Sequence, residues 1–271
     1  MKSFITAALI SMSFTASSQT YSLEKLWETD SIIAVPESVL PQKDFLFVSL
    51  IDGGGWVADG KGGVAKLTLD GKIIDADWIT GLNAPKGLGR VGNKLYVADM
   101  SEVIVIDINK GQIEKRITID SAQGLNDITT TPKGIVFVSD SRRGNIWRIE
   151  NDIPVRHFEN MRGVNGLKAV DNDLYIGAGK SFIKAGNDKV IKTVAELPQG
   201  IDGIEPIGNG DFIVTSWGGW IFYVFADGRF EILLETHAQK KNTADIGYDA
   251  AKRILYIPSF NGKTVAAYKL K

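Results

Sequence analysis

Polar side chains recur at one place in a repeated pattern of short apolar segments. Six apolar residues each follow a turn-like stretch by two positions: Val39, Leu88, Ile128, Leu167, Ile204 and Ile246. The residues two places before them are Glu37, Lys86, Asn126, Asn165, Asp202 and Ala244. Carboxylate and amide oxygens are the ligands that hard divalent cations such as Ca²⁺, Mg²⁺ and Mn²⁺ prefer. If these positions meet in space, the pattern predicts an all-oxygen metal site.

Taken singly, these residues have an ordinary interpretation. Asn165-Gly166 and Asp202-Gly203 are common turn pairs, and Asn126-Asp127 is a common way to begin a strand. Turn chemistry alone, however, would not select the same position of the repeat four times. The shared register therefore favours a common site over isolated turns.

Lys86 does not fit a simple metal site, because an ammonium group repels a cation. Three alternatives follow: Lys86 turns away, it replaces the metal as the partner of Glu37 and Asp202, or it binds an anionic substrate group. His157 and His237 lie outside the pattern, so an imidazole-rich zinc site is not indicated. The pattern does not choose between Ca, Mg, Mn and Zn.

The elements that position these residues are short strands repeated about every forty residues. After each apolar residue comes a second strand: FLFVS, KLYVAD, IVFVSD, DLYIGA, DFIVTS and ILYIPS. Further strands follow, such as VIVIDI and NIWRIE, and helical patterning is absent. This arrangement is typical of an all-β, six-bladed β-propeller with four antiparallel strands per blade. A two-sheet sandwich is the competing fold, but equal units favour the ring.

Closure of the ring can be predicted from the two ends of the repeat. The last unit has strand material at 246–248, 254–259 and 264–270 and is one strand short, whereas residues 22–29 have no other partner. We expect this N-terminal segment to be the outer strand of the last blade, which would leave only short, protected edges. The first strand of every blade would line the channel, so that equal positions converge at one mouth. Polar groups buried there must be paired, hydrated or coordinating an ion.

Loops at the same mouth are expected to form its rim. The glycine-rich stretch Ile51–Gly63 has Trp56 at its middle and reads either as a flexible cover with an apolar ligand contact or as an insertion without order. Other rim residues are Arg142, Arg143, Lys180, Trp217 and Trp220. The cations would attract an anionic ligand or simply serve solubility. The tryptophans suggest a stacking wall, with one of them more suited to packing.

The N-terminal residues have the form of a secretory signal peptide. Lys2 precedes an apolar run over 4–14, and the small residues Ala16 and Ser18 stand where a signal peptidase would cut. We therefore expect a signal peptide over 1–18, a single propeller domain over 19–271, and a periplasmic or secreted protein. A buried N-terminal helix is the alternative.

Composition excludes several classes of function. The net charge is −1, the pI is about 6.2, and no run of Lys or Arg indicates nucleic-acid binding. The chain has no cysteine, which excludes thiol chemistry and disulfides. The apolar run is too short to span a bilayer, so no membrane insertion is expected. No G-x-S-x-G or H-E-x-x-H motif occurs, and GAGKS lacks the first glycine of a nucleotide loop. A small-molecule substrate or ligand remains as the expected partner, with the oligomeric state left open.

With these residues in view, the chain resembles the regucalcin/gluconolactonase family, also called senescence marker protein-like, of six-bladed propellers. The matching motifs are PES at Glu37, LNDI at Asn126, VNGL at Asn165 and IDGI at Asp202. The resemblance implies a divalent metal held by Glu37, Asn165 and Asp202. It also implies that Asn126 contacts substrate or water and that Asp202 is the general base. Family members acting on sugar lactones carry an Arg where this chain has Gly124, which argues against gluconolactone itself.

Two functions follow from these residues and motifs. The first is an exported, metal-dependent, lactonase-like hydrolase with Asp202 and Asn126 as catalytic residues and Lys86, Trp56, Arg142 and Trp217 contacting the substrate. It would act on a small sugar-acid-like lactone or ester. The alternative is a non-catalytic propeller that binds a ligand or protein, with Lys86 filling the channel mouth.

Overall fold

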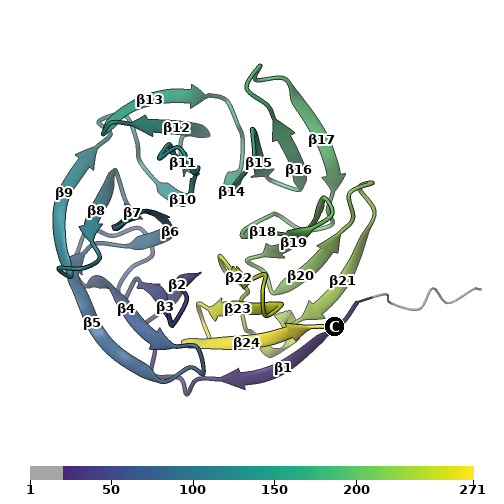
Figure 1. The fold of residues 1–271 in the computed structure, drawn as a ribbon, viewed down its shortest axis with the longest axis horizontal. Helices are drawn as coiled ribbons and strands as arrows, with labels where there is room; N and C mark the ends of the chain where they lie inside the picture. The colour runs from purple at the N-terminus through teal and green to yellow at the C-terminus, as the bar shows by residue number, and fades with distance from the viewer. Residues whose placement is uncertain (1–20) are drawn as a thin grey trace, which may run out of the picture.

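The computed structural model describes residues 21–271, so the predicted signal peptide over 1–18 lies outside the described residues. The chain forms six four-stranded antiparallel sheets arranged as a ring (Figure 1). This confirms the predicted six-bladed β-propeller. Among residues 21–271 the structure contains a single helical turn, η1 (His237–Gln239), and no helix there is long and apolar enough to cross a membrane.

Each blade consists of four strands in the order inner to outer. Blade 1 contains β2 (Pro36–Pro41), β3 (Phe45–Leu50), β4 (Gly62–Thr68) and β5 (Ile73–Leu82). Blade 2 contains β6 (Pro85–Val91), β7 (Lys94–Asp99), β8 (Glu102–Asp107) and β9 (Gln112–Thr118). Blade 3 contains β10 (Leu125–Thr130), β11 (Val136–Asp140), β12 (Asn145–Glu150) and β13 (Ile153–Phe158).

The remaining blades repeat the plan. Blade 4 contains β14 (Val164–Val170), β15 (Asp173–Ala178), β16 (Ser181–Ala185) and β17 (Ile191–Glu196). Blade 5 contains β18 (Ile204–Gly208), β19 (Asp211–Ser216), β20 (Trp220–Val224) and β21 (Phe230–Glu235). Blade 6 contains β22 (Gly247–Asp249), β23 (Ile254–Ser259), β24 (Thr264–Leu270) and β1 (Leu23–Glu28).

The core lies between neighbouring sheets, which explains the composition of the strands. Val105 and Ile117 of blade 2 belong to the same buried cluster as Ile128 and Val138 of blade 3. Second strands have neighbours on both faces, so β7 is buried from Leu95 to Asp99, whereas the outer strand β9 alternates between exposed residues and half-buried or buried ones. The six apolar residues that define the repeat are all buried: Val39, Leu88, Ile128, Leu167, Ile204 and Ile246.

A β-bulge interrupts the inner strand of four blades at the same place. The pairing of the first two strands skips residues between Pro36 and Val39, Pro85 and Leu88, Leu125 and Ile128, and Val164 and Leu167. A bulge changes the direction of the side chains it contains and is common beside functional sites. The skipped residues include Glu37, Lys86, Asn126 and Asn165, so the bulge explains why polar residues stand at this register.

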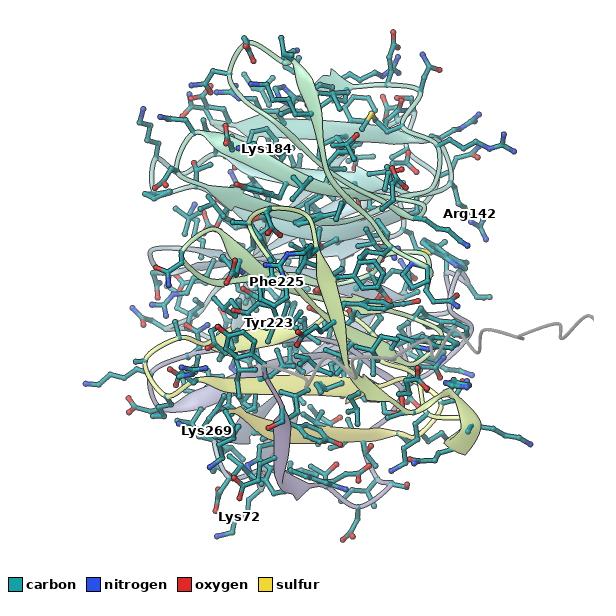
Figure 2. The ribbon with its side chains drawn as sticks, turned by 90° about the vertical axis from the view of Figure 1, so that its right-hand side faces the viewer. Lys72, Arg142, Lys184, Tyr223, Phe225 and Lys269 are labelled. Atoms are coloured by element: carbon teal, nitrogen blue, oxygen red, sulfur yellow. The ribbon has the colours of Figure 1, made fainter. Side chains whose placement is uncertain are left out.

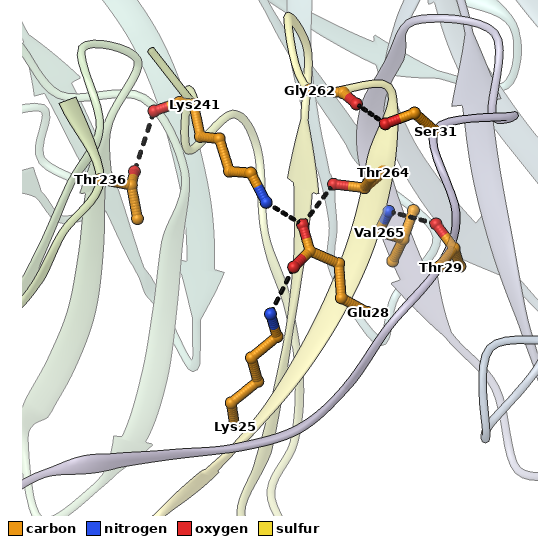
Figure 3. Close-up of polar contacts among 9 residues, drawn as sticks. All are labelled: Lys25, Glu28, Thr29, Ser31, Thr236, Lys241, Gly262, Thr264 and Val265. Carbon is orange, nitrogen blue, oxygen red and sulfur yellow. Dashed lines mark hydrogen bonds and ion pairs between the residues drawn. The ribbon is translucent and has the colours of Figure 1, made fainter. Parts of the chain in front are cut away.

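The ring is closed by β1, as the sequence predicts. β1 pairs with β24, and Glu28 at its end accepts a hydrogen bond of 2.9 Å from Thr264 and contacts Lys25 and Lys241 (Figure 3). The backbone of Val265 also donates to Thr29 at 3.0 Å. The first described strand and the last strand of the chain therefore form one sheet.

The ring has two faces with different loops. One face carries the connections between blades and the loops from each second strand to its third, and we call it the mouth face. Figure 2 shows Arg142 on this face and Lys72 and Lys269 toward the opposite one. The loop over 51–61 joins β3 to β4 and belongs to the mouth face; we call it the cover loop.

Candidate functional site

The five predicted polar residues come from five different blades, and we call them the mouth residues: Glu37, Lys86, Asn126, Asn165 and Asp202. Four of them are at most 8 % exposed, and Asn165 is partly buried. In blade 5 the same register precedes β18, where the backbone N–H of Asp202 donates to Thr215 at 2.8 Å. Ala244, the sixth position, is fully buried.

Asn165 and Asp202 are joined directly. The Nδ2 of Asn165 donates to Oδ1 of Asp202 at 2.8 Å, which leaves the amide oxygen of Asn165 free. This oxygen and Oε2 of Glu37 are both buried without a hydrogen-bond partner among the described residues. A buried oxygen without a partner is costly, and a hydrogen-bond donor or a cation at these atoms would remove that cost.

Burial and mutual repulsion disturb the acids of the mouth. Burial raises the pKa of Asp202 to about 7, and Asp245 adds to this, while the amide of Asn165 and the charge of Lys86 oppose it. Burial also raises the pKa of Glu37 well above its usual range; Lys86 opposes this shift, and Asp202 and Asp245 increase it. The carboxyl groups of Glu37 and Asp202 therefore interact electrostatically, which supports their placement in one site.

Lys86 points toward the cover loop. Its Nζ lies 4.3 Å from the centre of the Trp56 ring, and it forms no ion pair with Glu37 or Asp202 within the described part of the chain. Burial lowers the pKa of Lys86, and the charges of Glu37 and Asp202 oppose this effect. The structure therefore does not show Lys86 replacing a metal as the direct partner of Glu37 and Asp202, which was one of the three alternatives.

Trp56 also contacts Arg142, whose guanidinium carbon lies 4.9 Å from the ring centre. Gly124 makes this contact possible, because a Cβ there would be 3.0 Å from the Trp56 ring and 2.7 Å from Cγ of Arg142. The indole of the cover loop thus sits beside two cations, one from blade 2 and one from blade 3. Cation–π contacts of this kind hold a loop in place.

The other rim residues have separate surroundings. Trp217 is half-exposed and meets Phe260 edge-on with ring centres 6.0 Å apart. Trp220 stacks on His237 at 4.3 Å, so it is the packing member of the pair. Lys180 is exposed and forms no ion pair within residues 21–271. Neither tryptophan contacts the ring of Trp56 among the described aromatic pairs.

Sequence reasoning missed a second row of polar residues, which consists of Ser38, Asp127 and Asp245. Asp127 accepts the backbone N–H of Leu167 in the next blade at 2.5 Å, and Ser38 donates to Asp245 at 2.5 Å. These bonds join inner strands of neighbouring blades. The signal was present one residue after the mouth register, where the chain reads Ser38, Gly87, Asp127, Gly166, Gly203 and Asp245.

Lys168 and Glu205 form a further pair on the inner strands of blades 4 and 5, with 2.7 Å between their charged atoms. The inner strands and the residues just before them thus carry five acids and two lysines that influence one another: Glu37, Asp127, Asp202, Glu205, Asp245, Lys86 and Lys168. Acids in excess over buried lysines create a negative environment. Such an environment is stabilised by a bound cation or by protonation.

The residues present fit a divalent cation bound through oxygens. Within residues 21–271 no three carboxylate or imidazole side chains converge on one point, so carboxylates alone do not form the ligand set. Two carboxylates with amide oxygens do fit, because the unpartnered atoms are a carboxylate oxygen of Glu37 and the amide oxygen of Asn165, next to Asp202.

Comparisons with known proteins extend to the fold. No family model matches the chain, and no curated protein matches it by sequence. A solved streptogramin B lyase has a TM-score of 0.68 with 11 % identity, covering 93 % of this chain and 98 % of that one. A catalytically inactive virginiamycin B lyase from Staphylococcus aureus, solved with quinupristin, has a TM-score of 0.65 with 14 % identity, covering 92 % and 99 %. At this identity the likeness shows that the chain shares the architecture of these propellers.

Proposed function

We propose that this chain is an exported, metal-dependent hydrolase of lactonase type that acts on a small sugar-acid-like lactone or ester. The observation that carries the proposal is the pair of buried, unpartnered oxygens on Glu37 and Asn165 beside Asp202. The fold neighbours are described as lyases, which supports enzyme chemistry on this architecture. The signal-like residues 1–18 support export to the periplasm or the medium.

Glu37, Asn165 and Asp202 are the residues that would hold the ion. A bound divalent ion supplies polarisation of a carbonyl group and lowers the pKa of a bound water. Asp202, buried and bonded to the amide of Asn165, would accept the proton of the attacking water. Asn126 is fixed by donating to Ser141 at 3.1 Å and would orient the substrate.

The cover loop would complete the site from above. It contains three consecutive glycines before Trp56, and the indole is held by Lys86 and Arg142. A hinged loop of this kind excludes water from the reacting groups once substrate is bound. Trp56 would supply apolar contact to the substrate, and Trp217 would border the same rim.

A binding propeller without turnover is the second candidate, and the burial of Lys86 beneath Trp56 favours it. In that case the ammonium group would bind the ligand directly, and no metal would be required. The two candidates differ in their dependence on a divalent ion.

Metal content and a thermal melt separate them. We expect N-terminal sequencing of the mature protein to give Gln19 as its first residue. We also expect this protein to contain a divalent metal and to melt at a lower temperature when a chelator is present. Asp202→Asn should abolish the chelator effect and reduce turnover of a lactone panel by at least 100-fold. Asp171→Asn, an exposed acid on the opposite face, is the matched control. Absence of metal, together with a melt that added Ca²⁺, Mg²⁺, Mn²⁺ and Zn²⁺ leave unchanged, would overturn the hydrolase proposal.

A further inference from the structure

A hollow of about 310 Å³ lies on the mouth face between blades 3 and 4. Its walls are the loop from β11 to β12 and the connection from β13 to β14. Three arginines line it, namely Arg142, Arg143 and Arg162, together with Ser141 and Asn160. We call this cavity the arginine hollow.

The three guanidinium groups have no acidic partner in the part of the chain that the structure describes. Within residues 21–271 none of them forms an ion pair, whereas the nearby Arg156 pairs with Glu159 at 3.5 Å. The acid closest in sequence, Asp140, is occupied by backbone N–H groups of Gly124 and Arg143. Asp120 borders a neighbouring hollow that shares Arg143 and also contains Arg156. The three arginines are exposed, and an anion placed between their like charges would offset the repulsion that water only partly screens.

The arginine hollow adjoins the mouth residues at two points. Ser141 accepts the hydrogen bond that fixes Asn126. Arg142 extends from the hollow to the Trp56 ring, on which Nζ of Lys86 also lies. A molecule seated at the mouth would therefore need only a short extension toward blade 4 to reach the arginines.

We infer that the arginine hollow binds an oxyanion, either a carboxylate or a phosphate, carried by the molecule that occupies the mouth. Guanidinium groups present paired N–H donors that match the two oxygens of such groups. The link to a substrate rests on the proposed function, but binding of the anion itself does not. The substrate class is thus narrowed to compounds with an anionic group beside the reacting ester or lactone.

Anion binding is tested directly with inorganic phosphate and, separately, acetate as probes, titrated at low ionic strength by calorimetry. We expect Arg162→Gln to weaken binding of the preferred probe about tenfold and Arg143→Gln/Arg162→Gln to weaken it further. The matched control is Arg253→Gln, an exposed arginine on the opposite face that forms no ion pair with any described residue. Which probe binds more tightly tells phosphate from carboxylate. Equal affinity in wild type and Arg162→Gln, or an equal loss in Arg253→Gln, would overturn the inference.

A second measurement separates this inference from the proposed function. Two lactones that differ by one carboxylate are compared, and Arg162→Gln should raise KM about tenfold for the anionic compound while leaving kcat and the neutral compound unchanged. If phosphate or acetate binds through Arg162 but no lactone is hydrolysed, the hydrolase proposal fails and the anion site stands. If hydrolysis requires metal but Arg162→Gln changes neither anion affinity nor the KM ratio, the anion site fails and the hydrolase stands.

Discussion

At the scale of single residues, the orientation of one amide decides what the mouth can bind. Asn165 donates its Nδ2 to Asp202, so its oxygen, like Oε2 of Glu37, is buried without a hydrogen-bond partner among the described residues. Lys86 contributes charge to the same place without pairing to either acid, since its Nζ lies on Trp56. If the mouth binds a cation as proposed, the charge of Lys86 would weaken that binding.

Replacing Lys86 by Met tests that balance. Lys86→Met removes a positive charge that acts on Glu37 and Asp202 and keeps an unbranched, apolar side chain against Trp56. We expect the affinity for Ca²⁺ or Mn²⁺ to rise several-fold, measured by calorimetry. Lys61→Met, an exposed change in the cover loop, should leave it unchanged. Weaker metal binding in Lys86→Met would show instead that the ammonium group belongs to the ligand site.

At the scale of elements, the bulged inner strands depend on close contact between blades. Gly166 occupies the second bulge position of β14, and a Cβ there would lie 1.8 Å from the carbonyl oxygen of Asp202. Gly87 is similarly confined, with a Cβ 2.5 Å from the backbone nitrogen of Ile128. Glycine at these places sets the distance between blades at the height of the mouth.

Gly166→Ala should therefore destabilise the protein. The clash involves backbone atoms that cannot rotate away, so we expect a loss of about 2–3 kcal/mol in the free energy of unfolding. Gly200→Ala, at an exposed glycine near the same junction, should change stability by less than about 1 kcal/mol, because its Cβ would lie 3.8 Å from the nearest atom, an ordinary contact. Urea unfolding measures both, and equal stability of the two variants would contradict the packing argument.

The positions of the inner strands and of most mouth residues could be predicted from the sequence, but some of their contacts could not. The repeated apolar residues fixed the register of Glu37, Asn126 and Asp202, because strands of equal blades carry equal positions to the same end. Asp127 was missed because the bulge in its strand breaks the period of two, and Asp245 was missed because its bond to Ser38 depends on a neighbouring blade far away in the sequence. The direction of Lys86 depends on a loop from another blade, and no local pattern encodes such a contact.

At the scale of the whole molecule, stability depends on the junction where β1 joins blade 6. Burial acts to raise the pKa of Glu28, but hydrogen bonds from Lys241, Lys25 and Thr264 outweigh it and lower the pKa to about 2. Because the folded pKa lies below the unfolded value, this contribution is complete above about pH 4.5 and is lost as the pH falls through about 2.

Glu28→Gln should accordingly destabilise the protein in a pH-dependent manner. We expect a loss of about 1–2 kcal/mol at pH 6, reduced for the partial exposure of the group, and a difference near zero at pH 2. Glu24→Gln, which breaks an exposed ion pair with Lys271 on the same strand, should cost less than about 0.5 kcal/mol. Chemical denaturation at the two pH values measures the change, and a loss of equal size at both would contradict the assigned role of the Glu28 charge.

The pairing of β1 with β24 also determines when the ring can close during folding. Blade 6 is built from β1 and from three strands more than 200 residues later, so β1 has no partner until β24 has been synthesised. The other five sheets can assemble during synthesis, but the ring stays open, with the edge of β1 unpaired, until then. Proteolysis beyond Ser22 would remove residues of β1 and leave β24 without its outer partner. The site of any N-terminal cleavage would therefore decide whether the ring stays closed.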